Sequence, residues 1–366
     1  MKSLTLSLFF SKGMSLKSWD KIGMFEREVA LYKKLQDHKV QINFITYGDS
    51  SESDYSKVLP GINILSNNFN LPNYIYEKFL HRIHKKILMD SHIIKTNQMK
   101  GANIALRSSL CWNKPLIARF GYMWSEFAKQ NGENSFKKIE VYENKVINSS
   151  KRVVVTTNKM KNNIINRIPK AANKTLVIPN YVEVDRFTPN FNRQKEFDLL
   201  YVGRLNKQKN IQSLISAVKS TQIKTMIIGN GPQKKLVQEA IGISNGKITW
   251  VEKISNSELP EIMNNSSIFI LPSFYEGHPK TLIEAMACGM PVIGANSPGI
   301  REIIEDGKNG ILCNTESESI QKSINSLLSN PELTQKIGNN AREFVLNNFS
   351  LDNIINMEVD LYRDLI

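Results

Sequence analysis

The stretch that decides the fold is LPSFYEGHPKTLIEAMACGMPVIGANSPGIREII, residues 271–304. An apolar run that ends at Leu271 predicts a strand, Glu276–Pro279 predicts a loop, and the residues from Thr281 onwards predict a helix. A second apolar run, Pro291–Gly294, predicts the next strand. Strands that alternate with helices in this way are typical of a parallel α/β sheet with right-handed crossovers.

Two glutamates are placed around the start of that helix. Glu276 precedes the predicted helix, and Glu284 lies about one turn inside it. Backbone amides at a helix start favour phosphate, and carboxylates accept hydrogen bonds from sugar hydroxyls. The arrangement therefore predicts one ligand that carries both phosphate and sugar. A glycosidase would instead need its two carboxylates on either side of a scissile bond, which so short a segment does not favour.

A second turn of this kind lies upstream, in VGRLNKQKN, residues 202–210. Gly203 allows a close turn at the carboxyl end of a strand, where open α/β sheets bind their ligands. Arg204 offers a planar fork of donors and Lys209 a point charge, five residues apart. This pair is suited to a diphosphate.

The segment IIGNGPQKK, residues 227–235, contains a strand that runs into a glycine turn and then a helix. As a dinucleotide fingerprint it lacks the third glycine, because Lys234 stands in that place. Glu252 does lie about 20 residues further on, where a ribose-binding acid is expected in a dehydrogenase. A nicotinamide-dependent oxidoreductase therefore stays open as an alternative.

The domain organisation follows from an interruption of the pattern at IPNYVEVDRFTP, residues 178–189. Its prolines and polar residues are typical of a linker, and strand–helix alternation runs on both sides of it. We expect a Rossmann-like N-terminal acceptor-binding domain over residues 1–180 and a Rossmann-like nucleotide-sugar-binding domain over residues 181–348. Residues 349–366 are expected to form a C-terminal helix that packs back on the first domain. The long stretch 122–149 is expected to be helical.

Charge is unevenly distributed along the 366 residues, whose formal net charge is +14. Residues 1–180 carry 29 Lys and Arg against 13 Asp and Glu, whereas residues 181–366 carry 19 against 21. A net of +16 in the first half favours an anionic partner such as a membrane surface, a phosphorylated ligand or a nucleic acid. The basic residues are scattered and show no RNA-binding motif with interleaved aromatics, which disfavours specific nucleic-acid binding.

Cysteine usage and hydropathy indicate the compartment. Cys111, Cys288 and Cys313 are far apart and form no CxxC pair, so neither a disulfide framework nor a zinc site is expected. No dense Asp/His cluster indicates a metal site. No apolar run approaches the ~20 residues that a membrane-spanning helix needs. The sequence predicts a cytoplasmic protein, soluble or peripheral on a membrane.

Several of these segments carry a family resemblance. VGRLNKQKN, IGNGP, EGHPKTLIEAMACGMPVI and GIREIIEDGKNG, in this order, resemble the C-terminal half of the retaining GT-B glycosyltransferases with the E-x7-E motif, glycosyltransferase family 4 or "glycosyl transferases group 1". IPNYVEVDRFTP is similar to that family's linker, and the likeness covers most of residues 176–350. It implies two facing Rossmann-like domains and a retaining, metal-independent hexosyltransferase. No cofactor is implied, because the nucleotide sugar is a substrate.

The resemblance also implies roles for particular residues. The catalytic residues are expected to be Glu276, Arg204 and Lys209. The donor-binding residues are expected to be Gly23, Gly203, Arg204, Lys209, Gly277, His278, Pro279, Thr281, Leu282 and Glu284. No metal-ligating residue is expected.

The first half departs from the family in two places. GMFER, from Gly23, resembles the family's GGxER helix start, but Met24 replaces the second glycine. Where the family often carries a histidine after a strand, this chain reads ARFGYM and has Phe120. Arg119 or Tyr122 are the candidates to substitute for it.

The function that the resemblance implies is transfer of a sugar from a UDP- or GDP-sugar to a glycan acceptor. The acceptor is expected to be linked to polyprenyl diphosphate, in envelope polysaccharide biosynthesis at the inner face of the plasma membrane. A sugar-nucleotide epimerase or a phosphorylase of the same fold remains an alternative, as does the oxidoreductase. A non-enzymatic nucleic-acid binder is suggested by charge alone.

Overall fold

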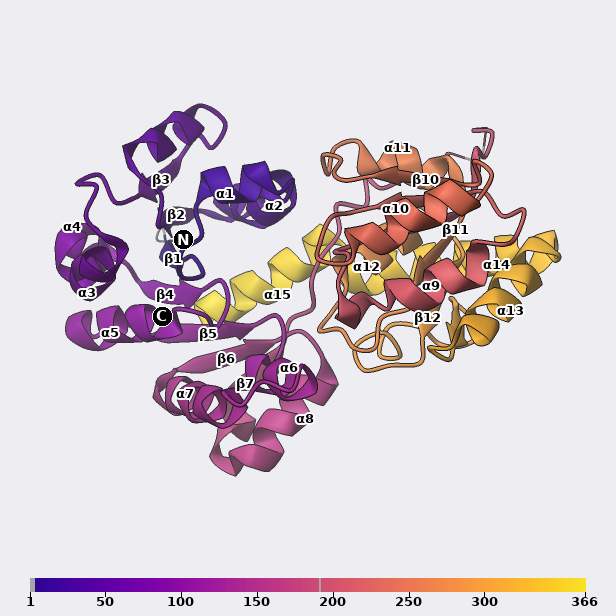
Figure 1. Ribbon diagram of the computed structural model, residues 1–366. Helices are drawn as coiled ribbons and strands as arrows, with labels where there is room; N and C mark the ends of the chain where they lie inside the picture. Colours follow the sequence, from indigo (N-terminus) through magenta and orange to yellow (C-terminus); the bar gives the residue numbers. More distant parts are fainter. Residues whose placement is uncertain (1–3, 191) are drawn as a thin grey trace. The chain divides into compact units, whose positions relative to one another are not determined.

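The computed structural model describes residues 4–190 and 192–366, so residues 1–3 and 191 of the predicted domains lie outside the described residues. The chain forms two compact units. The first runs to Pro179 and takes up the chain again from Ile355 to Ile366, and the second is Asn180–Ile354 (Figure 1). The sequence had placed the corresponding boundaries at residues 180 and 348.

The first unit is built on a parallel sheet with the strand order β3-β2-β1-β4-β5-β6-β7. Its strands are β1 (Leu4–Phe9), β2 (Val40–Ile45), β3 (Ile62–Leu65), β4 (Ile93–Thr96), β5 (Leu116–Phe120), β6 (Arg152–Val155) and β7 (Thr175–Val177). The strands are short and rich in β-branched residues, and most positions outside the edge strands β3 and β7 are buried because helices cover both faces. This is a doubly wound sheet, as predicted.

The two faces of this sheet carry different helices. Phe10 stacks on Trp19 of α1 (Leu16–Lys21), and Phe44 packs edge-on against Tyr32 of α2 (Phe25–Leu35). The opposite face packs against helices α3 (Asn73–Ile83), α4 (Lys85–Asp90), α5 (Ala102–Trp112), α7 (Phe136–Ser149) and α8 (Asn158–Arg167). Since successive side chains of a strand point to opposite faces, one strand serves both layers.

The stretch 122–149, predicted to be helical, is interrupted by a turn. The structure has α6 (Trp124–Gln130) and α7, separated by a turn at Gly132. Gly132 has φ +74°, its amide donates to the Lys129 carbonyl at 3.1 Å, and the Glu133 amide donates to the Ala128 carbonyl at 2.8 Å. This is a Schellman cap, in which a glycine in the left-handed region ends the helix.

The second unit repeats the design with the strand order β10-β9-β8-β11-β12-β13, all parallel. Its strands are β8 (Phe197–Val202), β9 (Thr225–Ile228), β10 (Ile248–Val251), β11 (Ser266–Leu271), β12 (Val292–Ala295) and β13 (Ile311–Cys313). Its helices are α9 (Ile211–Val218), α10 (Lys234–Ile243), α11 (Leu259–Asn264), α12 (Lys280–Ala287), α13 (Ser317–Leu328) and α14 (Pro331–Phe349). A single apolar core joins these elements.

The last helix, α15 (Leu351–Arg363), returns to the first unit from Ile355 onwards. Lys95, in the middle of β4, is fully buried, and its Nζ contacts Glu358 Oε1 at 2.5 Å and the Tyr362 hydroxyl at 3.1 Å. A buried charge is costly unless it is paired, so this contact fixes α15 on the first sheet. The predicted α/β architecture with a returning C-terminal helix is confirmed.

Short 3₁₀ turns complete the described chain. They are η1 (Gln36–His38), η2 (Ser50–Lys57), η3 (Pro169–Lys174) and η4 (Lys207–Lys209).

Candidate functional site

The second sheet has its topological switch point between β8 and β11. The two strands are neighbours, and the chain continues to β9 and β10 on one side and to β12 and β13 on the other. In open α/β sheets ligands bind outside the carboxyl ends of the strands at this point, because the two loops there diverge. The loops are residues 203–210 after β8 and residues 272–279 after β11, which are the two turns that the sequence singled out.

The two loops are joined by backbone and amide contacts. The Phe274 amide donates to the Gln208 carbonyl at 2.9 Å, and Gln208 Nε2 donates to the Tyr275 carbonyl at 2.8 Å. Asn210 Nδ2 donates to the carbonyls of Pro272 and Thr315, at 3.2 and 2.8 Å. The loops at the switch point are therefore positioned by the scaffold before any ligand arrives.

An ion pair connects the same loops. Lys209 Nζ lies 2.5 Å from Glu276 Oε1, and the two side chains are only 16% and 8% exposed. The pair joins the predicted diphosphate-binding lysine to the predicted sugar-binding acid, 67 residues away in sequence. Arg204 is exposed in the same loop, and within the described part of the chain no hydrogen bond or ion pair engages its guanidinium. One cation is thus held in place and the other points to solvent.

The loop that contains Glu276 rests on a third loop, which follows β12. The Glu276 amide donates to the Pro298 carbonyl at 2.8 Å, and Ser297 Oγ donates to the Ser273 carbonyl at 2.7 Å. Gly299 has φ +84°, and a Cβ there would overlap the carbonyl oxygens of Glu276 and Gly277. The sequence analysis missed these supports, although the SPG triplet after a strand is a recognisable turn signal.

His278 is buried, and its contacts with other parts of the chain position the loop. Asn180 Nδ2 donates to the His278 carbonyl at 2.7 Å, and the His278 ring packs edge-on against Phe349, with centroids 4.8 Å apart. Pro279 follows it as the N-cap of α12. The contacts of the His278 side chain hold the loop in place. We therefore expect this loop to contact the donor through the backbone of Gly277–Pro279.

Helix α12 begins at Lys280, after the loop, as the sequence predicted. Thr281 and Leu282 lie in its first turn, where amides lack partners within the helix. Glu284 is one turn further and almost completely buried, and Asn256 Nδ2 donates to its Oε1 at 3.3 Å. Burial and, after it, the Glu284 carboxylate raise the pKa of the nearby Cys288 thiol to about 12. Glu284 is therefore a buried acid at the helix start.

The glycines of the β8 and β9 turns have a packing role. A Cβ at Gly229 would overlap the Gly203 carbonyl, and one at Gly231 would overlap the Leu205 carbonyl. The Leu205 amide also donates to the Asn230 carbonyl at 2.9 Å. The GNG turn thus fixes the Gly203–Lys209 loop by close backbone approach.

Glu252, the acid that a dinucleotide-binding site would need for the ribose, is engaged in other contacts. Glu252 accepts a hydrogen bond from Asn230 Nδ2 at 2.9 Å and lies 3.8 Å from Lys234 Nζ. It belongs to the contacts around the glycine turn, so an oxidoreductase is not favoured.

Gly23 belongs to the first unit, whereas every other predicted donor-site residue belongs to the second. Its φ is +71°, its amide donates to the Asp20 carbonyl at 2.9 Å, and the Met24 amide donates to the Trp19 carbonyl at 2.8 Å. This is the Schellman cap of α1, which by itself accounts for the glycine. The donor contact of Gly23 stays a prediction.

In the first unit, the position of the family histidine is filled by a buried apolar residue. Phe120 is fully buried in the core, Arg119 Nη1 donates to the Asn97 carbonyl at 3.2 Å, and the Tyr122 ring lies 4.8 Å from that of Phe127. These two polar neighbours of Phe120 contribute to local packing.

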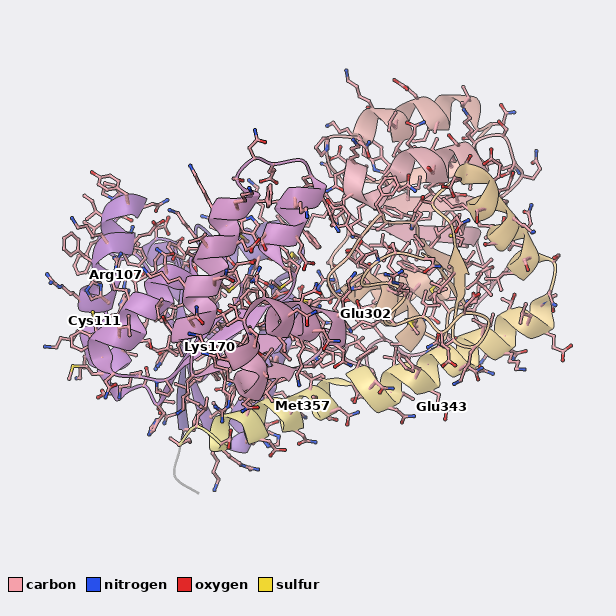
Figure 2. The ribbon with its side chains drawn as sticks, turned by 90° about the horizontal axis from the view of Figure 1, so that it is seen from below. Arg107, Cys111, Lys170, Glu302, Glu343 and Met357 are labelled. Atoms are coloured by element: carbon pink, nitrogen blue, oxygen red, sulfur yellow. The ribbon has the colours of Figure 1, made fainter. Side chains whose placement is uncertain are left out.

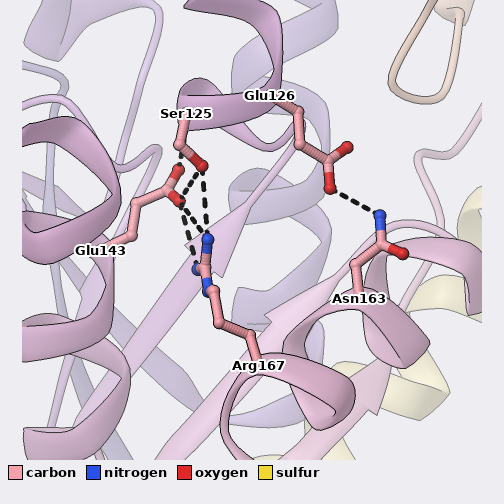
Figure 3. Close-up of polar contacts among 5 residues, drawn as sticks. All are labelled: Ser125, Glu126, Glu143, Asn163 and Arg167. Atoms are coloured by element: carbon pink, nitrogen blue, oxygen red, sulfur yellow. Dashed lines mark hydrogen bonds and ion pairs between the residues drawn. The ribbon is translucent and has the colours of Figure 1, made fainter. Parts of the chain in front are cut away.

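The helix that follows Phe120 is held by a buried carboxylate (Figure 3). Glu143 accepts hydrogen bonds from the Ser125 amide and hydroxyl at 3.1 and 2.6 Å, and it pairs with Arg167 at 3.2 Å. Beside it, Asn163 Nδ2 donates to Glu126 Oε1 at 2.6 Å, and burial raises the pKa of Glu126. The sequence analysis did not single out these residues, whose partners come from three helices.

Within residues 4–190 and 192–366, no three His, Cys, Asp or Glu side chains gather in a way that could hold a metal ion. In the same residues, no helix combines the length and the apolar character required to cross a membrane.

Two family models together match most of the chain. A family model described as "Glycosyl transferases group 1" matches residues 184–344, and one described as "Glycosyltransferase Family 4" matches residues 28–186. An uncharacterized glycosyltransferase of Methanocaldococcus jannaschii is 27% identical over 330 residues, which cover 86% of this chain and 87% of that protein.

Solved structures share the fold over the whole chain. Sucrose-phosphate synthase from Thermosynechococcus elongatus superposes with a TM-score of 0.81 at 18% identity, over 99% of both chains. HepE from Anabaena, solved in complex with UDP-glucose, gives a TM-score of 0.77 at 17% identity, over 99% of this chain and 100% of that one. At these identities the likeness is one of fold.

Proposed function

The chain belongs to the GT-B glycosyltransferases, and from this premise we propose that it moves a sugar from a UDP- or GDP-sugar to a glycan acceptor with retention of anomeric configuration. The observation that carries the proposal is the 2.5 Å Lys209–Glu276 pair at the switch point of the second sheet. A cation and an acid are held side by side where α/β sheets bind phosphorylated ligands. The UDP-glucose in the HepE structure is a ligand of this chemistry.

Each group has a task toward such a donor. Arg204 and Lys209 bind the diphosphate, helped by the amides at the start of α12. In the absence of donor, Glu276 neutralises Lys209. An arriving diphosphate competes for Lys209 and releases Glu276 to accept hydrogen bonds from the sugar. Glu284 accepts hydrogen bonds from the ribose.

Catalysis then depends on the leaving group. As the bond to the anomeric carbon breaks, negative charge grows on the diphosphate, and donors already in place stabilise it without reorganisation. We propose that these two cations also make a metal unnecessary, so that a chelator leaves turnover unchanged. An acceptor that attacks on the leaving group's own face gives retention, which the anomeric configuration of the product reports.

For the acceptor we propose a glycan on polyprenyl diphosphate, in envelope polysaccharide assembly. The support is the net charge of +16 on residues 1–180, against −2 on the remainder. A positively charged domain is attracted to an anionic membrane, where such an acceptor resides. The protein is then a peripheral one at the cytoplasmic face.

The test is thermal unfolding of the purified protein with UDP, GDP, CMP or NAD. A ligand at about 100 times its dissociation constant stabilises the fold by roughly 2.7 kcal/mol. We expect a shift with UDP or GDP, and a much smaller one in Glu284→Gln. Glu239→Gln, on the exposed side of α10, is the matched control and should keep the full shift. A shift with NAD alone, or with none of these ligands, would sink the proposal.

A further inference from the structure

Helices α3 and α5 of the first unit form a continuous surface. Arg107 Nη1 on α5 donates to the Lys78 carbonyl on α3 at 3.1 Å, and Trp112 Nε1 donates to the His81 carbonyl at 2.9 Å. Lys85, at the start of α4, lies with its Nζ 5.4 Å from the centre of the Trp112 ring. The three helices adjoin one another in the first unit (Figure 1).

This surface, which we call the α3–α5 surface, consists of exposed cations and exposed apolar groups. Its members are Tyr74, Lys78, Arg82, Lys85, Arg107 and Leu110. The α3 members lie four residues apart and so share one side of the helix. On α5, Arg107 and Cys111 are also four residues apart and both exposed (Figure 2).

The cations of this surface have no acidic partners. Within the described residues, no ion pair engages Lys78, Arg82, Lys85 or Arg107. The acid on α3, Glu77, pairs with Lys12 at 2.8 Å. Arg107 and Arg82 both act to lower the pKa of His81, after the larger effect of burial, which agrees with cations gathered around it. Such a cluster favours an anionic partner.

The apolar members indicate which anionic partner fits. Tyr74 is 72% exposed and Leu110 is 68% exposed, and on their helices they lie one turn from Lys78 and Arg107. A helical surface with exposed apolar groups among Lys and Arg is suited to the headgroup region of a bilayer, where cations meet phosphates and the apolar groups enter the acyl boundary. A nucleic acid would leave Leu110 without an apolar partner.

We propose that the α3–α5 surface is where this protein docks on a bilayer containing anionic phospholipid. The inference rests on the lipid-linked acceptor of the proposed function and adds the surface through which the protein reaches the membrane. Helices α3 and α5 lie on the face of the first sheet opposite to α1 and α2. The two pairs of helices contact alternate residues of the strands, which point to opposite faces of the sheet.

The test is co-sedimentation with phosphatidylcholine vesicles, with and without phosphatidylglycerol, at about 0.15 M salt. Wild-type protein should bind the anionic vesicles only. Each cation near the surface contributes about a fivefold gain in partitioning, so Arg82→Glu with Lys85→Glu should weaken binding on the order of thirtyfold or more. The matched control is Lys33→Glu with Lys34→Glu on α2, which makes the same change in net charge and should bind within a few-fold of wild type.

A second readout locates the contact. Cys111 is exposed, whereas burial raises the pKa of Cys288 and of Cys313 to about 12, so a thiol-reactive fluorophore labels Cys111. A polarity-sensitive dye there should shift to the blue on anionic vesicles.

Three results overturn the inference: equal binding to both vesicle types, equal losses in the two charge-reversed variants, or displacement from vesicles by single-stranded RNA at equal phosphate concentration. The UDP- or GDP-induced thermal shift should be the same in the Arg82/Lys85 variant as in wild type. Loss of that shift in wild type counts against the proposed function and leaves the vesicle result standing.

Discussion

The two units share one strand order around their switch points but use it differently. In the second unit, the loops after β8 and β11 are joined by an ion pair and by close backbone contacts at Gly229 and Gly299. In the first unit, the most strongly buried ion pair, Lys95–Glu358, lies on a face of the sheet. The second unit thus fixes its loops, where phosphate recognition needs preorganised donors. The first unit fixes helix α15 and carries a net positive charge.

The largest effect is expected where the first unit holds its buried pair. Lys95→Met leaves Glu358 buried without its cation, which should cost about 3–5 kcal/mol of unfolding free energy, measured by urea denaturation. The control is Lys308→Met in the second unit, which removes an exposed partner of Glu305 and should cost less than about 1 kcal/mol. Similar losses in the two variants would contradict the contrast between the units.

A catalytic effect comes next, in the second unit. Lys209→Ala and Arg204→Ala should each lower turnover about a hundredfold or more, by analogy with removal of one oxyanion-stabilising donor. Lys207→Ala removes an exposed lysine from the same turn and should leave turnover within about twofold. Near-wild-type rates in the first two variants would remove these residues from the site.

The smallest effect concerns the loop beneath Glu276. Gly299→Ala places a Cβ against the Glu276 and Gly277 carbonyls at a positive φ and should cost about 2–3 kcal/mol, with a fall in donor affinity. Gly307 has φ +73° with open space around it, so Gly307→Ala isolates the cost of the backbone conformation. If calorimetry gives both variants the same melting temperature, Gly299 does not support the loop.

The local architecture of the site was predictable because it depends on residues that are neighbours in the sequence. The strand, loop and helix between Leu271 and Ala287 follow from hydrophobic periodicity and the EGHP turn. The Lys209–Glu276 pair and the Gly299 contact join loops that no local pattern connects. The break at Gly132 was missed although the polar run QNGENS, residues 130–135, contains an Asn-Gly turn signal, and the positive φ of Gly132 ends the first of the two helices.

The returning helix α15 has a consequence for how the molecule is made. Residues 180–354 are synthesised before residues 355–366, so every residue of the second unit has been added to the chain while the first unit still lacks most of α15. Until then Lys95 has no Glu358 to meet, and the face of β4 that α15 covers stays open. The unit whose synthesis begins first is therefore completed only by residues that follow the whole of the second unit.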